Sequence, residues 1–213
     1  MARPSAIDAV LFDFDGVCAD TEPFGIMLDK EVYAYYGIDP TPEEMESLAG
    51  TTGVESIPAL FRHYGMDVSA EEFWTHRRPN VTIYRDLPIQ VVPGIPELLA
   101  CLRESGRKLA LVSTTDSASI NFALNRLGLA SAFDIRICGD MVERHKPDPE
   151  PYLAGVAALG VDPTRCGAVE DSPTGIHAAK AAGLYTLGYA GYTLHQDTSE
   201  ADETVGSFVG LAL

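Results

Sequence analysis

Between residues 90 and 190 the chain alternates short apolar runs with segments of helical pattern, and this alternation constrains the fold more than any other feature. The apolar runs cover residues 108–112, 133–138, 166–169 and 185–189. Helical segments, punctuated by Pro near the start or Gly near the end, cover residues 97–105, 117–127, 151–159 and 174–182. Such alternation is typical of a parallel sheet with helices on both faces. We therefore expect ligands to bind beyond the carboxyl ends of the strands.

A separate apolar run at residues 7–12 indicates a first strand, but the next strand begins only at residue 108. Residues 21–87 carry amphipathic helical stretches and no clear strand. We therefore predict a Rossmann-like parallel sheet in an α/β core domain of residues 1–20 and 88–213, interrupted by a helical domain of residues 21–87. In the tail, residues 195–213, an acidic loop is followed by a weakly apolar end, and we expect a short edge element or a partly mobile segment there.

The acidic composition narrows the range of partners. The 213 residues include 31 acidic and 15 basic side chains, and the formal net charge of −16 repels nucleic acids and anionic membrane surfaces. No apolar run is long enough to span a bilayer and no signal peptide is apparent, so we expect a cytoplasmic protein with no nucleic-acid or membrane partner. Four cysteines lack C-x-x-C spacing and are expected to be buried, reduced thiols: Cys18, Cys101, Cys138 and Cys166.

Acidic residues follow two of the predicted strands. Asp13 and Asp15 come directly after the first strand, where side chains two residues apart would project about 6 to 7 Å from each other. Glu170 and Asp171 follow the strand at 166–169. Taken alone, each pair is explained by a turn or a helix cap. Together they need a cation, because two like charges 4 Å apart repel by about 4 kcal/mol at an effective dielectric of 20. An all-oxygen site suits Mg²⁺.

Three further residues lie where they could neutralise a phosphate at the same edge. Lys146 follows the run at 133–138, Ser113 ends the run at 108–112, and Thr114 offers its backbone amide beside Ser113. Considered alone, Lys146 is explained by a solvated surface position and Ser113 and Thr114 by a cap and turn.

Taken together, these segments resemble a known family. "DFDGV" at residues 13–17, Ser113, Lys146 in "KPDPEPY" and "VEDSPTG" at residues 169–175 resemble, in order and spacing, the four motifs of the haloacid dehalogenase (HAD) superfamily. The similarity extends over residues 7–190. The helical insert after the first motif resembles the four-helix cap of the β-phosphoglucomutase-like phosphatases in that superfamily.

The resemblance implies a Mg²⁺-dependent phosphatase that hydrolyses a small phosphomonoester, such as a sugar phosphate, through an aspartyl-phosphate intermediate. By this similarity Asp13 is the nucleophile and Asp15 is the general acid and base. The phosphoryl oxygens are bound by Ser113, the amide of Thr114 and Lys146, so Ser113 and Lys146 share in catalysis. The resemblance further implies that Mg²⁺ is held by the side chains of Asp13, Glu170 and Asp171 and by the backbone carbonyl of Asp15.

A β-phosphoglucomutase-type phosphosugar mutase is the alternative, because its core resembles that of the phosphatases. Mutase caps resemble "D-T-x-x-x-H" and "L-K-G-x-x-R", whereas Gly25, Ala49 and Gly53 stand here in place of the histidine, lysine and arginine. A phospho-accepting signalling protein of the receiver type is an alternative of another class, but it has no equivalent of Asp15 and no helical insert of this size. The dehalogenases themselves lack the second aspartate and the metal.

The sequence does not determine which residues of the helical insert select the substrate. Five residues could either face the site or be solvated: Arg62, His63, His76, Arg77 and Arg78. Near-helical spacing predicts that four aromatic residues pack inside the insert: Tyr33, Tyr35, Tyr36 and Trp74. We expect a monomer or weak homo-oligomer whose ligand is a small phosphorylated metabolite.

Overall fold

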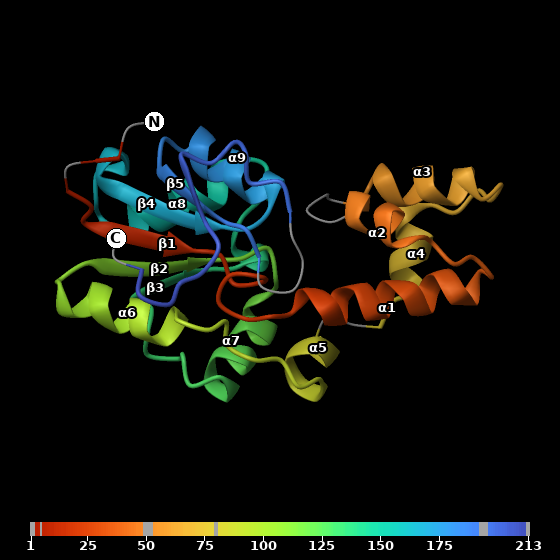
Figure 1. Cartoon of the computed structure of the whole chain (residues 1–213), viewed down its shortest axis with the longest axis horizontal. Helices are drawn as coiled ribbons and strands as arrows, with labels where there is room; N and C mark the ends of the chain where they lie inside the picture. Colours follow the sequence, from red (N-terminus) through yellow and green to blue (C-terminus); the bar gives the residue numbers. More distant parts are fainter. Residues whose placement is uncertain (1–2, 5, 49–52, 79–80, 192–195, 212–213) are drawn as a thin grey trace.

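The computed structural model describes residues 3–4, 6–48, 53–78, 81–191 and 196–211. Its centre is a six-stranded sheet in the order β3-β2-β1-β4-β5-β6 (Figure 1), with every neighbouring pair parallel. The strands are β1 (Ala9–Phe12), β2 (Lys108–Val112), β3 (Ile135–Ile137), β4 (Cys166–Glu170), β5 (Tyr185–Tyr189) and β6 (Glu203–Val205). The predicted parallel α/β fold is confirmed, and β6 is the short edge element expected in the tail.

Helices cover both faces of the sheet. The helices α6 (Ile95–Glu104) and α7 (Ser117–Arg126) share one apolar cluster with the strands, whereas α8 (Glu150–Leu159) and α9 (Pro173–Ala181) belong to a cluster on the opposite face. Successive strand residues alternate between the two clusters, since Val10 and Phe12 face α6 and α7 while Ala9 and Leu11 face α8 and α9. Two short 3₁₀ turns, η1 (Gly139–Met141) and η2 (Pro163–Arg165), lie in the connections.

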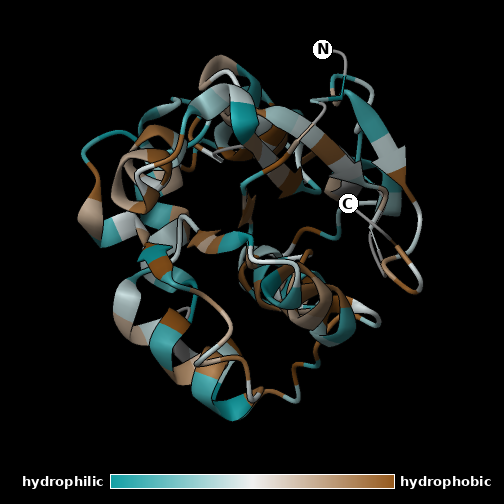
Figure 2. Cartoon of the chain, turned by 90° about the vertical axis from the view of Figure 1, so that its left-hand side faces the viewer, coloured by the Kyte–Doolittle hydropathy of each residue, from teal (hydrophilic) through white to brown (hydrophobic). Residues whose placement is uncertain are grey.

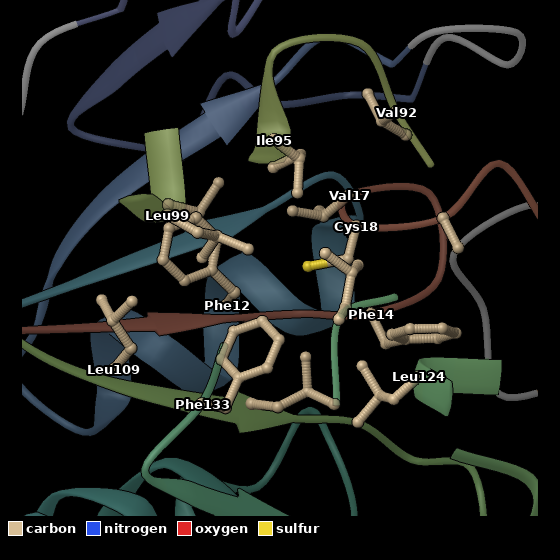
Figure 3. Close-up of a cluster of buried hydrophobic side chains, with 14 of the residues drawn as sticks. Phe12, Phe14, Val17, Cys18, Val92, Ile95, Leu99, Leu109, Leu124 and Phe133 are labelled. Carbon is tan, nitrogen blue, oxygen red and sulfur yellow. The ribbon is translucent and has the colours of Figure 1, made fainter. Parts of the chain in front are cut away.

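Figure 3 shows part of the apolar cluster on the α6 and α7 face, which includes the large side chains of Phe12, Phe14 and Phe133. Phe12 meets Phe133 edge to face with ring centroids 6.2 Å apart, and Cys18 lies buried in the same cluster. The predicted burial of the cysteines is confirmed for Cys18, Cys138 and Cys166 but is wrong for Cys101, which is exposed. The helical period explains the difference, because the α6 residues that face the sheet are its leucines and Ile95.

Five helices lie between β1 and α6 in the described residues of this segment. They are α1 (Glu22–Tyr35), α2 (Pro42–Leu48), α3 (Ser56–His63), α4 (Ala70–His76) and α5 (Val81–Asp86), and Figure 1 shows α1 to α4 grouped beside the sheet. Residues from α1, α2, α3 and α4 form an apolar cluster of their own around Tyr33, Phe61 and Phe73. In Figure 2 single helices carry both hydrophobic and hydrophilic residues, as helices with one buried side do.

The short helix α5 was not distinguished by the sequence pattern, because six residues are too few to show a helical period. Ile83 and Tyr84 of α5 join the apolar cluster of the sheet, and α5 packs against α7. The exact domain boundaries at residues 20/21 and 87/88 stay a prediction. Within the described residues, no helix has the length and apolar character needed to cross a membrane.

Candidate active site

The parallel register brings the ends of three strands to one edge. Phe12 of β1 pairs with Leu111 of β2 and with Val169 of β4. The residues that come next, Asp13, Val112 and Glu170, therefore lie at the same level along the sheet. The amide of Asp13 donates to the carbonyl of Val169 at 3.0 Å and the amide of Ser113 to that of Ile137 at 3.0 Å. The carboxyl edge of the sheet thereby gathers the residues that follow β1, β2 and β4.

Three of the predicted metal ligands meet at this edge. Asp13, Glu170 and Asp171 each place one carboxylate oxygen within 4.8 Å of the others, and all three side chains are buried. Burial first, and then the charges of neighbouring acidic residues, raise the pKa of Asp13 and the pKa of Asp171 above the usual range. These carboxyl groups can be ionised together only if cations compensate them.

Lys146 supplies one of those cations. Its Nζ lies 2.6 Å from Oδ1 of Asp13 and 2.6 Å from Oε1 of Glu170, and it also donates to the carbonyl of Val112 at 2.9 Å. Although burial alone lowers the pKa of Lys146, the carboxylates of Asp13 and Glu170 outweigh it and raise that pKa above the ordinary value. Lys146 is only 8% exposed, so the alternative explanation, a solvated surface lysine, is wrong.

The donor set fits a divalent magnesium ion. One ammonium group among three buried carboxylates leaves two negative charges uncompensated at full ionisation. Carboxylate oxygens are the ligands that Mg²⁺ prefers, and Mg²⁺ keeps room for water and phosphate oxygens. Among the described parts of the chain, this trio is the one group of three or more His, Cys, Asp or Glu residues close enough to hold a metal.

Asp15 lies in the turn after β1 and is bound by hydroxyl groups. Thr21 and Tyr84 each donate to its Oδ1 at 2.8 Å, and Thr115 donates to its Oδ2 at 3.1 Å. Ser113 lies 3.5 Å from Oδ2, at the long limit for a hydrogen bond. The Asp15 carboxyl group is therefore held in one orientation between β1 and α5. The sequence analysis missed Tyr84 and Thr115, and only Thr115 had a local signal, since it follows Ser113 and Thr114.

Two of the predicted phosphate-binding residues, Ser113 and Thr114, lie side by side after β2. Ser113 is buried, and its Oγ accepts a hydrogen bond from the amide of Thr115 at 3.0 Å. Thr114 is exposed and lines the same cavity as Asp13, Asp15 and Lys146. The structure thus brings together all seven residues that the sequence analysis assigned to the site.

Supporting residues hold the acidic pair after β4. Tyr152 of α8 donates its hydroxyl to Oε1 of Glu170 at 2.5 Å, and Gln196 donates to Oδ2 of Asp171 at 3.2 Å. A methyl group at Gly16 or Gly175 would lie closer than 3.0 Å to the carboxylate of Asp171 or Glu170, respectively. Glycine at these two positions therefore gives the carboxylates their space.

A cavity of about 810 Å³ opens in front of the acidic edge and extends between the sheet and the helices α1 and α4. Arg77 alone of the five cap candidates lines it. The remaining four do not, and three of them have partners elsewhere: His63 lies near Glu44, His76 near Tyr36, and Arg78 binds Glu31. Trp74 lines the cavity and is 44% exposed, so its predicted place inside the insert is wrong.

The other aromatic residues of the insert differ from one another. The prediction of a packed position is confirmed for Tyr33, which is 1% exposed, but is wrong for Tyr35, which is 68% exposed. Tyr36 is half-buried and meets Phe61 edge to face, with ring centroids 5.1 Å apart. Consecutive residues of a helix cannot all face inward, which accounts for this result.

Known proteins match most of this chain. A model of haloacid dehalogenase-like hydrolases matches residues 10–189. A phosphorylated carbohydrates phosphatase of Thermotoga maritima is 34% identical over 179 residues, which cover 84% of this chain and 82% of that protein. A β-phosphoglucomutase of Bacillus subtilis is 30% identical over 187 residues, with coverages of 84% and 82%. Among solved structures, a CbbY mutant from Rhodobacter sphaeroides in complex with xylulose-(1,5)bisphosphate is 31% identical over 96% of each chain, with a TM-score of 0.77.

Proposed function

This chain belongs to the haloacid dehalogenase-like hydrolase family and is a phosphatase of the HAD type, and we propose that it hydrolyses a small phosphorylated sugar or related phosphomonoester through an aspartyl phosphate on Asp13. The observation that carries the proposal is the meeting of Asp13, Lys146 and two further carboxylates at the carboxyl edge of the sheet, where Asp13, Lys146 and Asp171 line the cavity. The substrate class is supported by the Thermotoga relative, which by its name acts on phosphorylated carbohydrates, and by the CbbY structure, which holds a sugar bisphosphate.

In the first step a carboxylate oxygen of Asp13 attacks phosphorus, and the bond from phosphorus to the oxygen of the leaving alcohol breaks. Asp15 gives its proton to that departing oxygen. The hydroxyl groups of Thr21, Tyr84 and Thr115 fix the orientation of Asp15, so its proton is delivered in one direction. The products of this step are the free alcohol and a phosphorylated Asp13.

In the second step water attacks the phosphorus of the aspartyl phosphate. Asp15, now ionised, accepts the proton of this water, and the bond from phosphorus to the oxygen of Asp13 breaks. Inorganic phosphate leaves, and both aspartates return to their starting states. Two easier displacements, the first by the Asp13 carboxylate and the second by water on the aspartyl phosphate, replace one difficult attack by water on the monoester.

Positive charge at the phosphoryl group comes from the protein and from a metal. Lys146, the hydroxyl of Ser113 and the amide of Thr114 would bind the phosphoryl oxygens. Mg²⁺ would be held by Asp13, Glu170, Asp171 and the backbone carbonyl of Asp15. When bound, it would supply charge neutralisation and hold the phosphate in line with Asp13.

We extend the proposal to the helical insert of residues 21–87 as a cap that covers the cavity. Hydrolysis is favoured over the mutase alternative because Gly25 and Gly53 line the cavity at positions where a mutase resembling this chain would carry a histidine and an arginine. Ala49, at the position of the mutase lysine, lies outside the described residues. The match to the hydrolase family and the helices inserted after β1 also argue against the receiver-type alternative.

The proposal is tested by phosphate release from a panel of sugar phosphates, nucleotides and small phosphomonoesters with Mg²⁺. The panel includes β-glucose 1-phosphate with a bisphosphate primer and detection of glucose 6-phosphate. We expect release from one class of compound, no turnover in Asp13→Asn, and a long-lived aspartyl phosphate in Asp15→Asn. Formation of glucose 6-phosphate without release would replace the phosphatase by a mutase, and full activity of Asp13→Asn would remove the nucleophile assignment.

A further inference from the structure

We propose that Asp29, Tyr33 and Arg77 form a subsite in the cavity that binds adjacent hydroxyl groups of an uncharged sugar or polyol chain and disfavours a second phosphate. This inference rests on the proposed function, because it describes the part of the substrate that lies beyond the phosphoryl group at Asp13. It narrows the substrate class to monophosphates of polyhydroxylated compounds.

The subsite is built on one side of α1. The residues of α1 that line the cavity are Glu22, Gly25, Ile26, Asp29 and Tyr33, and these positions, i, i+3, i+4, i+7 and i+11, lie along a single face of the helix. Glu22 starts this face near the acidic edge. Asp29 follows seven residues later, about 10 Å farther along the helix axis at 1.5 Å per residue. The face therefore leads from the phosphoryl site toward the outer part of the insert.

Asp29 and Arg77 form a fixed pair of hydrogen-bonding groups. Nε of Arg77 lies 2.5 Å from Oδ1 of Asp29, and the two side chains are only 9% and 26% exposed. Nη2 of Arg77 also lies 3.4 Å from the carbonyl oxygen of Gly25. The carboxylate accepts hydrogen bonds and the guanidinium donates them, whereas a sugar hydroxyl does both. Neighbouring hydroxyls can therefore bridge such a pair, which is the polar recognition expected in a small-molecule cavity.

Tyr33 supplies an independent observation that points to a ligand. Its side chain is 1% exposed and lines the cavity, yet its hydroxyl has no hydrogen-bond partner among the described residues. Phe61 and Phe73 hold the ring in place, with centroids 5.6 and 5.2 Å away. A buried hydroxyl without a partner destabilises a folded protein, so such groups in native structures need an explanation. A hydroxyl of the substrate would provide the missing partner.

The charge and shape of this end of the cavity favour a sugar over a phosphate. At this end of the cavity the guanidinium of Arg77 is already paired with the carboxylate of Asp29, so the pair carries no net positive charge. Arg77 lies over the ring of Trp74, 5.3 Å from its centroid, and this exposed ring also faces the cavity. Aromatic faces pack against the apolar side of a sugar ring. A second phosphate would therefore find no uncompensated positive charge beside this pair, whereas a neutral chain of hydroxyls needs none.

The test compares three kinds of substrate with Mg²⁺ present. They are the best substrate from a panel of hexose and pentose monophosphates, the matching sugar bisphosphate, and p-nitrophenyl phosphate, which has no sugar hydroxyls. For the wild type we expect kcat/KM to be higher for the monophosphate than for the bisphosphate. Tyr33→Phe should lower kcat/KM for the sugar monophosphate about tenfold, the effect of one lost hydrogen bond, and leave p-nitrophenyl phosphate within about twofold.

Two variants complete the experiment. Tyr35→Phe changes an exposed tyrosine of the same helix, and kcat/KM should stay unchanged for both the sugar monophosphate and p-nitrophenyl phosphate. Asp29→Asn removes one negative charge, so it should lower kcat/KM for the monophosphate and raise the ratio of bisphosphate to monophosphate turnover. Tyr33→Phe should not lower the urea midpoint, because the hydroxyl has no partner to lose.

Three results would overturn the subsite while leaving the phosphatase in place. They are equal losses for p-nitrophenyl phosphate and the sugar monophosphate in Tyr33→Phe, a lowered urea midpoint in that variant, or a wild-type preference for the bisphosphate. Failure to hydrolyse any phosphomonoester, p-nitrophenyl phosphate included, would instead overturn the proposed function and the subsite together.

Discussion

Replacing Gly175 by alanine tests how the acidic edge of the sheet is held. Gly175 lies in the first turn of α9, and its amide donates to Oγ of the capping residue Ser172 at 3.1 Å. A methyl group there would approach the carboxylate of Glu170 more closely than 3.0 Å, a separation that side-chain packing does not allow. Alanine must therefore displace the Glu170 carboxylate.

The cost follows from the partners of Glu170. Its Oε1 accepts hydrogen bonds from Tyr152 at 2.5 Å and from Lys146 at 2.6 Å. Hydrogen bonds to charged groups contribute about 1.5 to 3 kcal/mol each, whereas alanine gains at most about 1 kcal/mol over glycine in a helix. We expect Gly175→Ala to lower the free energy of unfolding by about 2 to 5 kcal/mol. The affinity for Mg²⁺ should fall as well.

The assay is urea unfolding in EDTA, followed by calorimetric titration with Mg²⁺. Gly25→Ala is the matched control, because Gly25 also lies inside a helix but its added methyl would meet Arg77 at an ordinary 3.6 Å. This control should gain up to about 1 kcal/mol of stability. If Gly175→Ala were as stable as the wild type and bound Mg²⁺ equally well, the tight enclosure of Glu170 would be refuted.

Three further predictions concern the site. Burial, and then the charges of Asp15 and Asp29, raise the pKa of Glu22 from 4.5 to about 7, so its stabilisation of the fold is complete below pH 4.5 and is lost as the pH rises through 7. In EDTA, Glu22→Gln should therefore gain up to about 3 kcal/mol over the wild type between pH 4 and pH 8, and an unchanged difference would contradict the shift. Tyr84→Phe removes a donor to Asp15 and should lower kcat about tenfold, measured by phosphate release; wild-type kcat would show that this hydrogen bond does not orient Asp15. EDTA should stop turnover reversibly, and Mg²⁺ at 100 times its Kd should add about 2.7 kcal/mol to the free energy of unfolding; activity in EDTA would exclude a required metal.

The amino-acid sequence by itself determined the sheet and the residues at its edge. Strand and helix alternate clearly along the chain, and parallel pairing leaves little freedom in where the strands end. Asp13, Ser113 and Glu170 directly follow or end strands, so the order of these elements is enough to bring them together. Lys146 was found through its motif, since a lone lysine in a loop carries no local signal of burial.

Only the tertiary structure decided which helix residues reach the site. Tyr84 and Tyr152 contact Asp15 and Glu170 from α5 and α8, and Tyr33 and Arg77 reach the cavity from α1 and the end of α4. A helical period states which residues share a face, but it does not state what that face will pack against. For strands the hydrogen-bonded register supplies that information. For helices, the partner of a given face depends on how the side chains of several elements fit together.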